Sequence, residues 1–408
     1  MWYHANQTAQ QTDFQVKTAT DIDEKLMREA IAEATLGEGG TRPNPPVGAV
    51  LAKDGAIVAR GHHRRAGSDH AEVDCLKKAG AAARGATLYV SLEPCSTAGR
   101  VGPCTSAIVE AGVSRVVYAA SDANPANSGR AAAVLESAGI DVVGGVLAQE
   151  ALPALEPFFT LVRTGRPFVT LKMAQSLDGA IADHAGVAKW ITGAEARAEV
   201  GRLRRRADAV MVGAGTITAD DPSLLRPSEP ESGLPGMRCA VDARGAIPGT
   251  AKIFTDGLAS RTIIATNSAL ATSQIGKWAA TGAAVWDLPL AFPPSTGGGS
   301  SAAAPRAAID LRALLEKFGR EGYMHVLCEG GAALASALVS EGLVDELHLF
   351  VAPAVFGRPS LGVFGSFPHD LPTAPRFNII SVQRFGDDIR LVLRPKSHPL
   401  RCSPCLPV

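Results

Sequence analysis

The first half of the chain begins with a helical pattern of apolar residues. Leu26, Ala30 and Ala34 recur at the spacing of one buried helix face, which predicts an amphipathic helix from about residue 22 to 36. Asp21 immediately precedes this stripe and is the predicted N-cap. The residues before it are polar and lack the apolar segment of a secretory signal. We therefore expect this N-terminal extension to be disordered.

Beyond this helix, strands and helices alternate. A strand pair is predicted over 47–61 around Asp54-Gly55, a dipeptide that favours a tight hairpin turn. The chain then continues as a predicted helix at 71–79, strand at 86–92, helix at 103–112, strand at 115–120, helix at 129–139 and strand at 140–144. This alternation indicates an α/β domain of about 150 residues.

The second half alternates again. Strands are predicted over 167–174, 208–213, 237–243, 261–266, 325–329 and 345–353, and helices over 196–207 and 333–342. Pro153 and Pro157 interrupt the pattern between the halves, so the domain linker is expected there. The stretch 292–305, FPPSTGGGSSAAAP, is low in complexity and is expected to form a mobile surface loop.

These boundaries divide the 408 residues into five predicted parts. They are a disordered extension (1–21), a first α/β domain (22–147), a linker (148–166), a second α/β domain (167–396) and a flexible tail (397–408). Two domains agree with the chain length, because a domain usually holds roughly 100–200 residues.

Composition narrows the classes of function. Lys plus Arg and Asp plus Glu both total 40, and this zero net charge gives no support for a nucleic-acid or membrane-surface partner. No apolar run reaches the ~20 residues of a membrane helix. Seven cysteines, an odd number, without a signal segment indicate reduced thiols and a cytoplasmic protein. Cys402 and Cys405 form a CxxC, which we interpret as part of a frayed tail rather than a redox or metal site.

Four residues at element junctions point to metal chemistry. His70, Cys95 and Cys104 supply one imidazole and two thiolates, the three protein ligands of a catalytic zinc site. Glu72 cannot share a helix face with His70, so we expect His70 at the helix entry and Glu72 in the first turn. There the carboxylate can carry a proton from water to a leaving amine.

The spacing of this motif refines the class. HxE followed by a PC dipeptide and a further cysteine is a signature of zinc deaminases, but here the second cysteine lies nine residues after Cys95 instead of three. Taken singly, His70 is more often a surface residue, and Cys95 and Cys104 are more often buried small hydrophobes. Their joint order at the junctions favours the metal site.

Longer segments carry a family resemblance. PNPPVG, GHHRRAG, HAEVDCL and SLEPCSTAGRVGPC resemble the deaminase half of the bifunctional riboflavin-biosynthesis pyrimidine deaminase/reductases. TGRPFVTLKMAQSLDGAIA, KWIT, DAVMVGAGTITADDPSL, CEGGAALASAL and GLVDELHLFVAP resemble the reductase half, in the expected order. The resemblance runs from about residue 23 to 395. It implies an α/β chain with an N-terminal cytidine-deaminase-like α/β/α domain and a C-terminal dihydrofolate-reductase-like domain.

The same resemblance implies two consecutive reactions on one small molecule. The first is zinc-dependent hydrolytic deamination of 2,5-diamino-6-(5-phosphoribosylamino)pyrimidin-4-one. The second is NADPH-dependent reduction of the ribosyl group, which gives 5-amino-6-(5-phosphoribitylamino)uracil. A homo-oligomer is also expected from the resemblance, whereas no nucleic acid or membrane is.

Several residues inherit roles from this family. The deaminase substrate is expected at Asn44, His63 and Arg100. The reductase substrate is expected at Lys172, Arg204, Leu224, Arg226 and Glu329, and the cofactor at Ala174, Trp190, Thr216, Asp220, Gly330 and Gly331. Two of these positions are also notable from the residues alone. Gly330-Gly331 between a strand and a helix can cradle a phosphate, although such a pair taken singly is more often a tight turn. A lysine in an apolar strand, such as Lys172, is expected to snorkel, to be paired or to face a cleft.

The chain departs from the family pattern at a few positions. Thr97 stands where a histidine is usual, and Ala98 where another ring is common. Ala188 replaces a common serine, Gly201 replaces a common histidine, and Arg226 falls one position early. A second hypothesis is therefore a reductase beside an impaired zinc-binding deaminase domain.

A third hypothesis is a zinc-stabilised structural or regulatory module without catalysis. Glu72 argues against it, because a structural zinc site closes with four ligands and needs no base.

Overall fold

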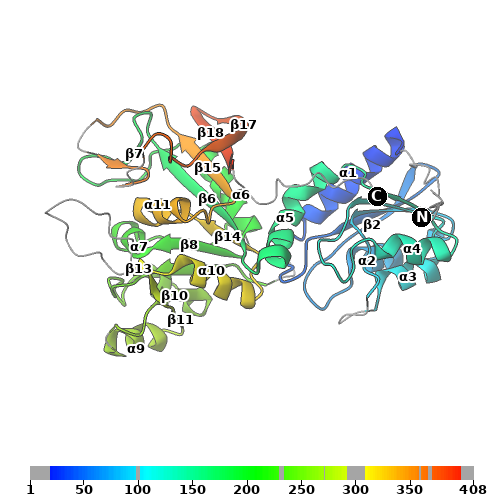
Figure 1. Ribbon diagram of the computed structural model, residues 1–408, viewed down its shortest axis with the longest axis horizontal. Helices are drawn as coiled ribbons and strands as arrows, with labels where there is room; N and C mark the ends of the chain where they lie inside the picture. Colours follow the sequence, from blue (N-terminus) through cyan, green and yellow to red (C-terminus); the bar gives the residue numbers. More distant parts are fainter. Residues whose placement is uncertain are drawn as a thin grey trace, which may run out of the picture.

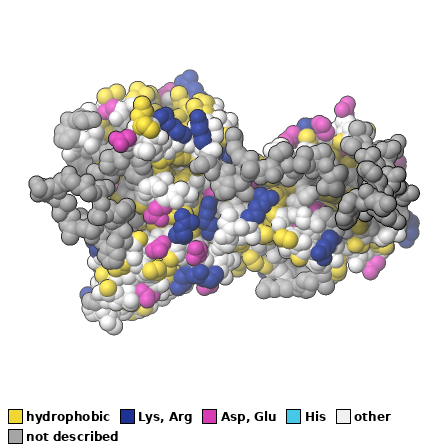
Figure 2. All heavy atoms as spheres, viewed as in Figure 1, with side chains coloured by type: hydrophobic (Ala, Val, Ile, Leu, Met, Phe, Trp, Pro, Cys, Tyr) yellow, Lys and Arg dark blue, Asp and Glu magenta, His cyan; other side chains and the backbone are white. Residues whose placement is uncertain are grey.

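The computed structural model describes residues 19–97, 102–228, 234–270, 272–291, 308–357, 360–365 and 370–396. Figure 1 shows two α/β lobes with helix α5 (Ala148–Thr164) at their junction, and Figure 2 shows the same lobes meeting at a narrower waist. Residues 1–18, the stretch 292–307 and the tail from 397 lie outside the described residues, so the predictions made for them stand as predictions. Within the described part, no helix combines the length and the apolar character needed to cross a membrane.

The N-terminal lobe is a five-stranded sheet between two layers of helices. Its strand order is β2-β1-β3-β4-β5, with β1 antiparallel to both neighbours and β3, β4 and β5 parallel. The elements are α1 (Asp21–Thr35), β1 (Gly48–Lys53), β2 (Ala56–His62), α2 (Ala71–Ala79), η1 (Gly80–Ala83), β3 (Thr87–Leu92), α3 (Cys104–Ala111), β4 (Arg115–Ala120), α4 (Arg130–Ser137) and β5 (Asp141–Gly144). Helices α1 and α5 lie on one side of the sheet, and α2, α3 and α4 lie on the other (Figure 1). The expected α/β/α arrangement is confirmed.

Local chemistry explains how this lobe begins. Asp54 and Gly55 both have positive φ, as the predicted hairpin turn requires. The predicted helix cap is wrong by one residue, because Thr20 caps α1. Its side chain accepts from the Asp23 amide while the Asp23 carboxylate accepts from the Thr20 amide, which forms a reciprocal capping box.

The same aspartate ties α1 to the sheet. Asp23 is 1% exposed and accepts hydrogen bonds from the Tyr89 hydroxyl at 2.9 Å and from Arg115 at 2.6 and 3.1 Å. Burial alone would raise its pKa, but the Arg115 and Thr20 hydrogen bonds outweigh burial and hold the pKa well below its usual range. This network anchors α1 against the sheet.

Replacing Asp23 with asparagine should lower the free energy of unfolding by about 3 kcal/mol at pH 7, because Arg115 loses its buried anionic partner. Since the folded-state pKa is depressed, the carboxylate stabilises the wild type above pH ~4 and this contribution declines as the pH falls further. Urea denaturation at pH 7 and pH 3 measures both effects. The control is Asp21→Asn on the exposed side of α1. An equal loss in both variants would contradict the role of the Asp23 network.

The C-terminal lobe is built on a nine-stranded sheet. Its order is β11-β10-β9-β8-β14-β6-β15-β18-β17, parallel from β11 to β15 and antiparallel in the last two strands. Its strands are β6 (Phe168–Gln175), β7 (Ala180–Ala182), β8 (Ala209–Gly213), β9 (Met237–Val241), β10 (Thr262–Thr266), β11 (Ala284–Asp287), β12 (Leu290–Ala291), β13 (Ala308–Ile309), β14 (His325–Cys328), β15 (Glu346–Val351), β16 (Leu361–Gly362), β17 (Phe377–Phe385) and β18 (Asp388–Pro395). The six strands predicted between residues 167 and 353 are confirmed as β6, β8, β9, β10, β14 and β15, whereas the parallel strand β11 was not predicted.

Helices cover both faces of this sheet. They are α6 (Ala194–Arg206), α7 (Ala214–Asp220), α8 (Lys252–Thr255), η2 (Ala259–Arg261), α9 (Thr272–Ala280), α10 (Leu311–Arg320) and α11 (Ala332–Ser340). One apolar core joins α10 and α11 to one sheet face, and a second joins α6 and α9 to the other. Consecutive strand residues such as Met211 and Val212 enter opposite cores, as a sheet buried on both faces requires.

The predicted linker is itself helical. Residues 148–164 form α5, with Pro153 and Pro157 inside it. The buried side chains of Ala151, Leu155 and Phe159 join the core of the N-terminal lobe. Packing of this apolar stripe outweighs the low helix propensity of two prolines.

Candidate active sites

The predicted metal ligands converge in the N-terminal lobe. His70 is the N-cap of α2, Cys95 follows β3, and Cys104 is the first residue of α3. The His70 Nδ1 atom lies 3.2 Å from Cys104 Sγ and 3.5 Å from Cys95 Sγ, and the three ligand atoms all lie within 4.8 Å of one another. The hydrogen bond from Cys104 lowers the pKa of the Cys95 thiol, which favours a thiolate ligand.

These distances fit zinc. Bond lengths of ~2.3 Å to sulfur and ~2.0 Å to nitrogen in a tetrahedral site separate the two ligand types by roughly 3.5 Å. One imidazole and two thiols are the donor set of a catalytic site, with a fourth position open. When bound there, a zinc ion acts as a Lewis acid that makes water a nucleophile near neutral pH.

Glu72 occupies the position expected of the proton carrier. It is the second residue of α2, is only 4% exposed, and its carboxyl group contacts the Cys104 thiol. Burial raises its pKa to about 7, helped by the charge of Cys95. A carboxyl group with a pKa near the working pH can both accept and return a proton.

Asn44 and His63 lie beside the metal ligand His70. The Asn44 side-chain amide lies 3.1 Å from His63 Nε2, and the His63 ring meets the His70 ring edge-on with centroids 5.3 Å apart. Burial lowers the pKa of His63, so its ring is neutral at pH 7. Arg100 and Ala98 lie outside the described residues, and Thr97 is exposed.

A supporting layer behind the ligands was not predicted from the sequence. The buried Glu93 carboxylate accepts from the amides of Asp122, Gly129 and Ala131. Asn127 accepts from the Ser96 amide at 2.6 Å, one residue after the ligand Cys95. The Glu-Pro-Cys order was the available signal, since a glutamate two residues before a ligand can fix the strand end that presents it.

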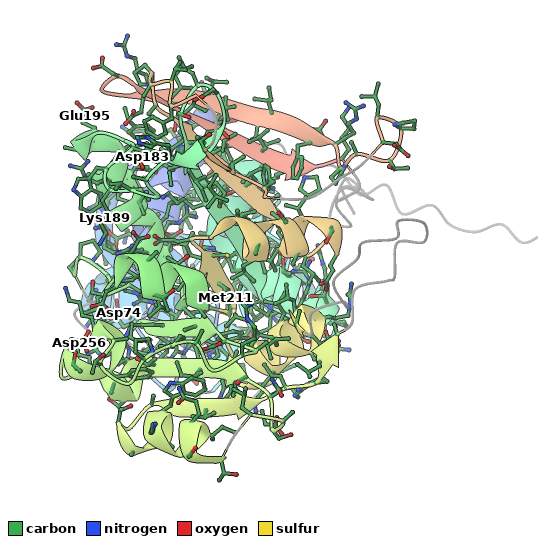
Figure 3. The ribbon with its side chains drawn as sticks, turned by 90° about the vertical axis from the view of Figure 1, so that its left-hand side faces the viewer. Asp74, Asp183, Lys189, Glu195, Met211 and Asp256 are labelled. Atoms are coloured by element: carbon green, nitrogen blue, oxygen red, sulfur yellow. The ribbon has the colours of Figure 1, made fainter. Side chains whose placement is uncertain are left out.

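The C-terminal lobe contains a cleft of about 580 Å³ above the parallel strands β6, β8 and β14. Its walls carry nine of the predicted residues: Lys172, Ala174, Trp190, Arg204, Thr216, Asp220, Leu224, Glu329 and Gly331. The volume is that of a small-molecule site, and parallel sheets bind ligands at their carboxyl ends. Figure 3 shows Lys189 at the outer edge of this lobe and Met211, on β8, inside it.

Three charged residues form the floor of this cleft. Both Glu329 carboxylate oxygens accept from Arg204, at 2.5 and 2.8 Å. Although burial would raise the pKa of Glu329, Arg204 and Lys172 lower it overall. Burial lowers the pKa of Lys172, whose ammonium lies 6.0 Å from the Phe350 ring. Lys172 thus lines the cleft, and its contact with the substrate stays a prediction.

Gly330 and Gly331 lie between β14 and α11, as the predicted phosphate-binding turn requires. Gly331 is the N-cap of α11, and its amide donates to the Thr216 hydroxyl at 3.0 Å. Gly330 has a φ of 87°, a conformation that favours glycine, and it lies beside the cleft without lining it. Trp190 is 71% exposed at the cleft wall, with the Arg197 guanidinium 4.8 Å from its ring.

The structure does not bring Arg226 into the cleft. This residue is 8% exposed, and its guanidinium donates to the carbonyls of Gly39 and Ala207. The Arg226 side chain therefore points toward Gly39 of the N-terminal lobe and not into the cleft. Three basic side chains that were not predicted line the cleft instead: Lys189, Arg197 and Lys252.

Comparisons with known proteins match both domains. Residues 20–120 match the cytidine and deoxycytidylate deaminase zinc-binding region, and residues 167–391 match the RibD C-terminal domain. The riboflavin biosynthesis protein RibD of Bacillus amyloliquefaciens is 37% identical over 92% of this chain and 97% of its own. That of Escherichia coli is 36% identical over 91% and 99%.

Solved structures give the same result. The structure of Acinetobacter baumannii RibD covers 92% of this chain and 99% of its own, with 35% identity and a TM-score of 0.78. A Thermotoga maritima deaminase/reductase has the same coverage, with 34% identity and a TM-score of 0.76.

Fold and sites together define a bifunctional enzyme, in which a zinc-dependent deaminase domain is joined to an NADPH-dependent reductase domain. The chain belongs to the RibD family of riboflavin biosynthesis. Nothing in the comparisons favours the reductase-only hypothesis, and the purely structural zinc module is not supported.

Proposed function

We propose that the N-terminal site deaminates 2,5-diamino-6-(5-phosphoribosylamino)pyrimidin-4-one by hydrolysis. The observation that carries this proposal is the buried Glu72 carboxyl group beside the His70, Cys95 and Cys104 triad. Glu72 accepts a proton from the attacking water and delivers it to the leaving amine. The second water proton ends on the adjacent ring nitrogen, so that ammonia departs, the ring gains a carbonyl oxygen, and the carboxylate is regenerated.

Asn44 and His63 position the pyrimidine in this proposal. Their side chains are hydrogen-bonded to each other at 3.1 Å and lie next to the ligand His70. A neutral His63 ring and an amide offer directional donors and acceptors to a heterocycle without adding charge. Arg100 remains the predicted contact for the sugar phosphate.

The C-terminal cleft carries the second proposed reaction, reduction of the ribosyl group to ribityl. Lys172, Arg204, Glu329 and Leu224 would hold the substrate, and NADPH supplies the hydride. The cofactor would lie along Ala174, Trp190, Thr216, Asp220, Gly330 and Gly331. The α11 N-terminus suits a phosphate group, and basic side chains on the walls suit two phosphorylated ligands.

Selective removal of zinc tests whether the two reactions occur at separate sites and only deamination needs the metal. Dialysis against a chelator should lower ammonia release more than about a hundredfold, because only the N-terminal site uses the metal. NADPH oxidation with the deaminated substrate should stay within about twofold, since no zinc ligand lines the C-terminal cleft. Added zinc should restore ammonia release. Loss of both activities in parallel would contradict separate sites.

We also propose that the enzyme is a cytoplasmic homo-oligomer that binds neither nucleic acid nor membranes. Edge strand β17 exposes 63% of Ile379 and 59% of Val382, a row that a second copy could cover. The five described cysteines are all free thiols, as a reducing compartment maintains. Sedimentation velocity should give a mass at least twice that of the chain, whereas a monomer at micromolar concentration would contradict the oligomer.

A further inference from the structure

The loop between α1 and β1 contacts both domains. We call residues 37–44 the bridging loop. On one side it packs against the deaminase site, where a Cβ atom on Gly37 would come within 2.6 Å of the His63 carbonyl oxygen. On the other side Gly39, at a φ of 70°, approaches so closely that a Cβ atom would lie 2.1 Å from the Arg205 carbonyl oxygen. The loop is therefore clamped between the two domains.

Consecutive residues of the bridging loop bond to the reductase domain. Glu38 pairs with Arg206 at 3.0 Å. The Gly39 carbonyl accepts from Arg226 at 2.9 Å, and the Gly40 carbonyl accepts from the Leu234 amide at 3.2 Å. These contacts come from the end of α6 and from the segment after the cleft residue Leu224.

Arg42 makes a further buried contact with the reductase domain. It is 8% exposed, its guanidinium lies 4.3 Å from the Tyr323 ring centroid, and it donates to the Asp208 carbonyl at 3.3 Å. Both groups belong to the reductase domain. The guanidinium also interacts electrostatically with the buried Asp208 carboxylate, and burying such a charge is costly in free energy unless it is well paired. The desolvation cost of this contact is more than is needed simply to hold the two domains together.

Docking is also provided elsewhere. Arg394 on β18 donates to both carboxylate oxygens of Glu156 on α5, each at 2.6 Å, and it also binds Glu346. Arg42 differs from this pair in its place in the chain. Arg42 lies two residues before Asn44. The Asn44 backbone amide donates to the Thr41 carbonyl at 3.0 Å, and the Asn44 side chain contacts His63. A short, hydrogen-bonded turn therefore connects the anchored guanidinium to the deaminase site.

We infer that Arg42 is a positioning residue for deamination, through which the reductase domain holds Asn44 against the pyrimidine. The inference rests on the proposed role of Asn44 in binding that substrate. It makes the reductase domain part of the deaminase binding site, although no reductase side chain needs to touch the pyrimidine.

Two substitutions, one in each domain, test this link. Arg42→Met keeps the alkyl stem and removes the guanidinium, and Tyr323→Leu removes the ring that it contacts. Each should raise the KM for deamination by roughly tenfold, with kcat within about threefold and zinc content unchanged, because binding geometry is disturbed and the chemical groups are not. Tyr323→Phe keeps the ring and should behave as the wild type. If one variant fails to fold, the other decides the question.

The control is Glu156→Gln, which weakens the other domain contact and should leave the KM unchanged. An unchanged KM in a folded Arg42→Met or Tyr323→Leu enzyme would overturn the inference. A rise of the same size in Glu156→Gln would also overturn it, because docking in general would then be the cause. Asn44→Ala tests the proposed substrate role of Asn44 separately from the positioning role of Arg42. If it leaves the KM unchanged, the proposed substrate role of Asn44 fails, whatever Arg42 does.

Discussion

Replacing Glu72 with glutamine should lower kcat for ammonia release by roughly 10²- to 10⁴-fold, the usual contribution of a positioned acid–base group. Glutamine has nearly the same shape but cannot accept or return the proton. Because the three ligands remain, zinc content should not change. The measurement is ammonia release with the diaminopyrimidinone substrate, together with metal analysis of the same protein.

Two comparisons make this result specific. Glu110→Gln, on the exposed side of α3 in the same domain, should retain full ammonia release. In Glu72→Gln, NADPH oxidation with the deaminated substrate should match the wild type. Full ammonia release by Glu72→Gln would exclude Glu72 as the proton carrier.

Replacing Lys172 with methionine should lower kcat/KM for the reductase by about a hundredfold, because a partly buried charge facing an anionic substrate is lost. Burial lowers the pKa of Lys172, so the wild-type activity should decline at a pH below the ordinary lysine value of 10.5. Lys172→Arg keeps the charge at alkaline pH and should move this decline upward. Initial rates of NADPH oxidation between pH 7 and 11 measure both effects.

Ammonia release should be unchanged in the Lys172 variants, since Lys172 lies in the reductase domain. Lys277→Met, an exposed lysine of α9, serves as the control for loss of one positive charge. Equal reductase activity in Lys172→Met and the control would remove Lys172 from the substrate site.

The sequence was sufficient to predict the metal site because its residues occupy element junctions. His70 and Cys104 stand at the starts of helices and Cys95 lies in the loop after strand β3, and such positions meet at the carboxyl edge of the parallel strands. The HxE spacing placed Glu72 in the first turn of α2, where the structure has it. These arguments depend only on local geometry, which the sequence determines.

Features set by contacts between distant segments could not be predicted in this way. Arg226 follows the cleft residue Leu224, yet its side chain turns to the Gly39 carbonyl of the other domain. The helical character of α5 depends on packing of Leu155 and Phe159 against a sheet that sequence periodicity does not show. The edge hairpin β17–β18 was missed because both faces of β17 are largely exposed, which leaves no apolar alternation to detect.

The most direct test of two consecutive reactions in one chain uses a single incubation. Wild-type enzyme would receive the diaminopyrimidinone substrate and NADPH deuterated at both C4 positions, and ammonia, NADP⁺ and the product mass would be followed together. We predict equal amounts of ammonia and NADP⁺, with one deuterium at C1′ of the ribityl chain. NADP⁺ formed without ammonia, or ammonia formed without any reduced product, would contradict the account.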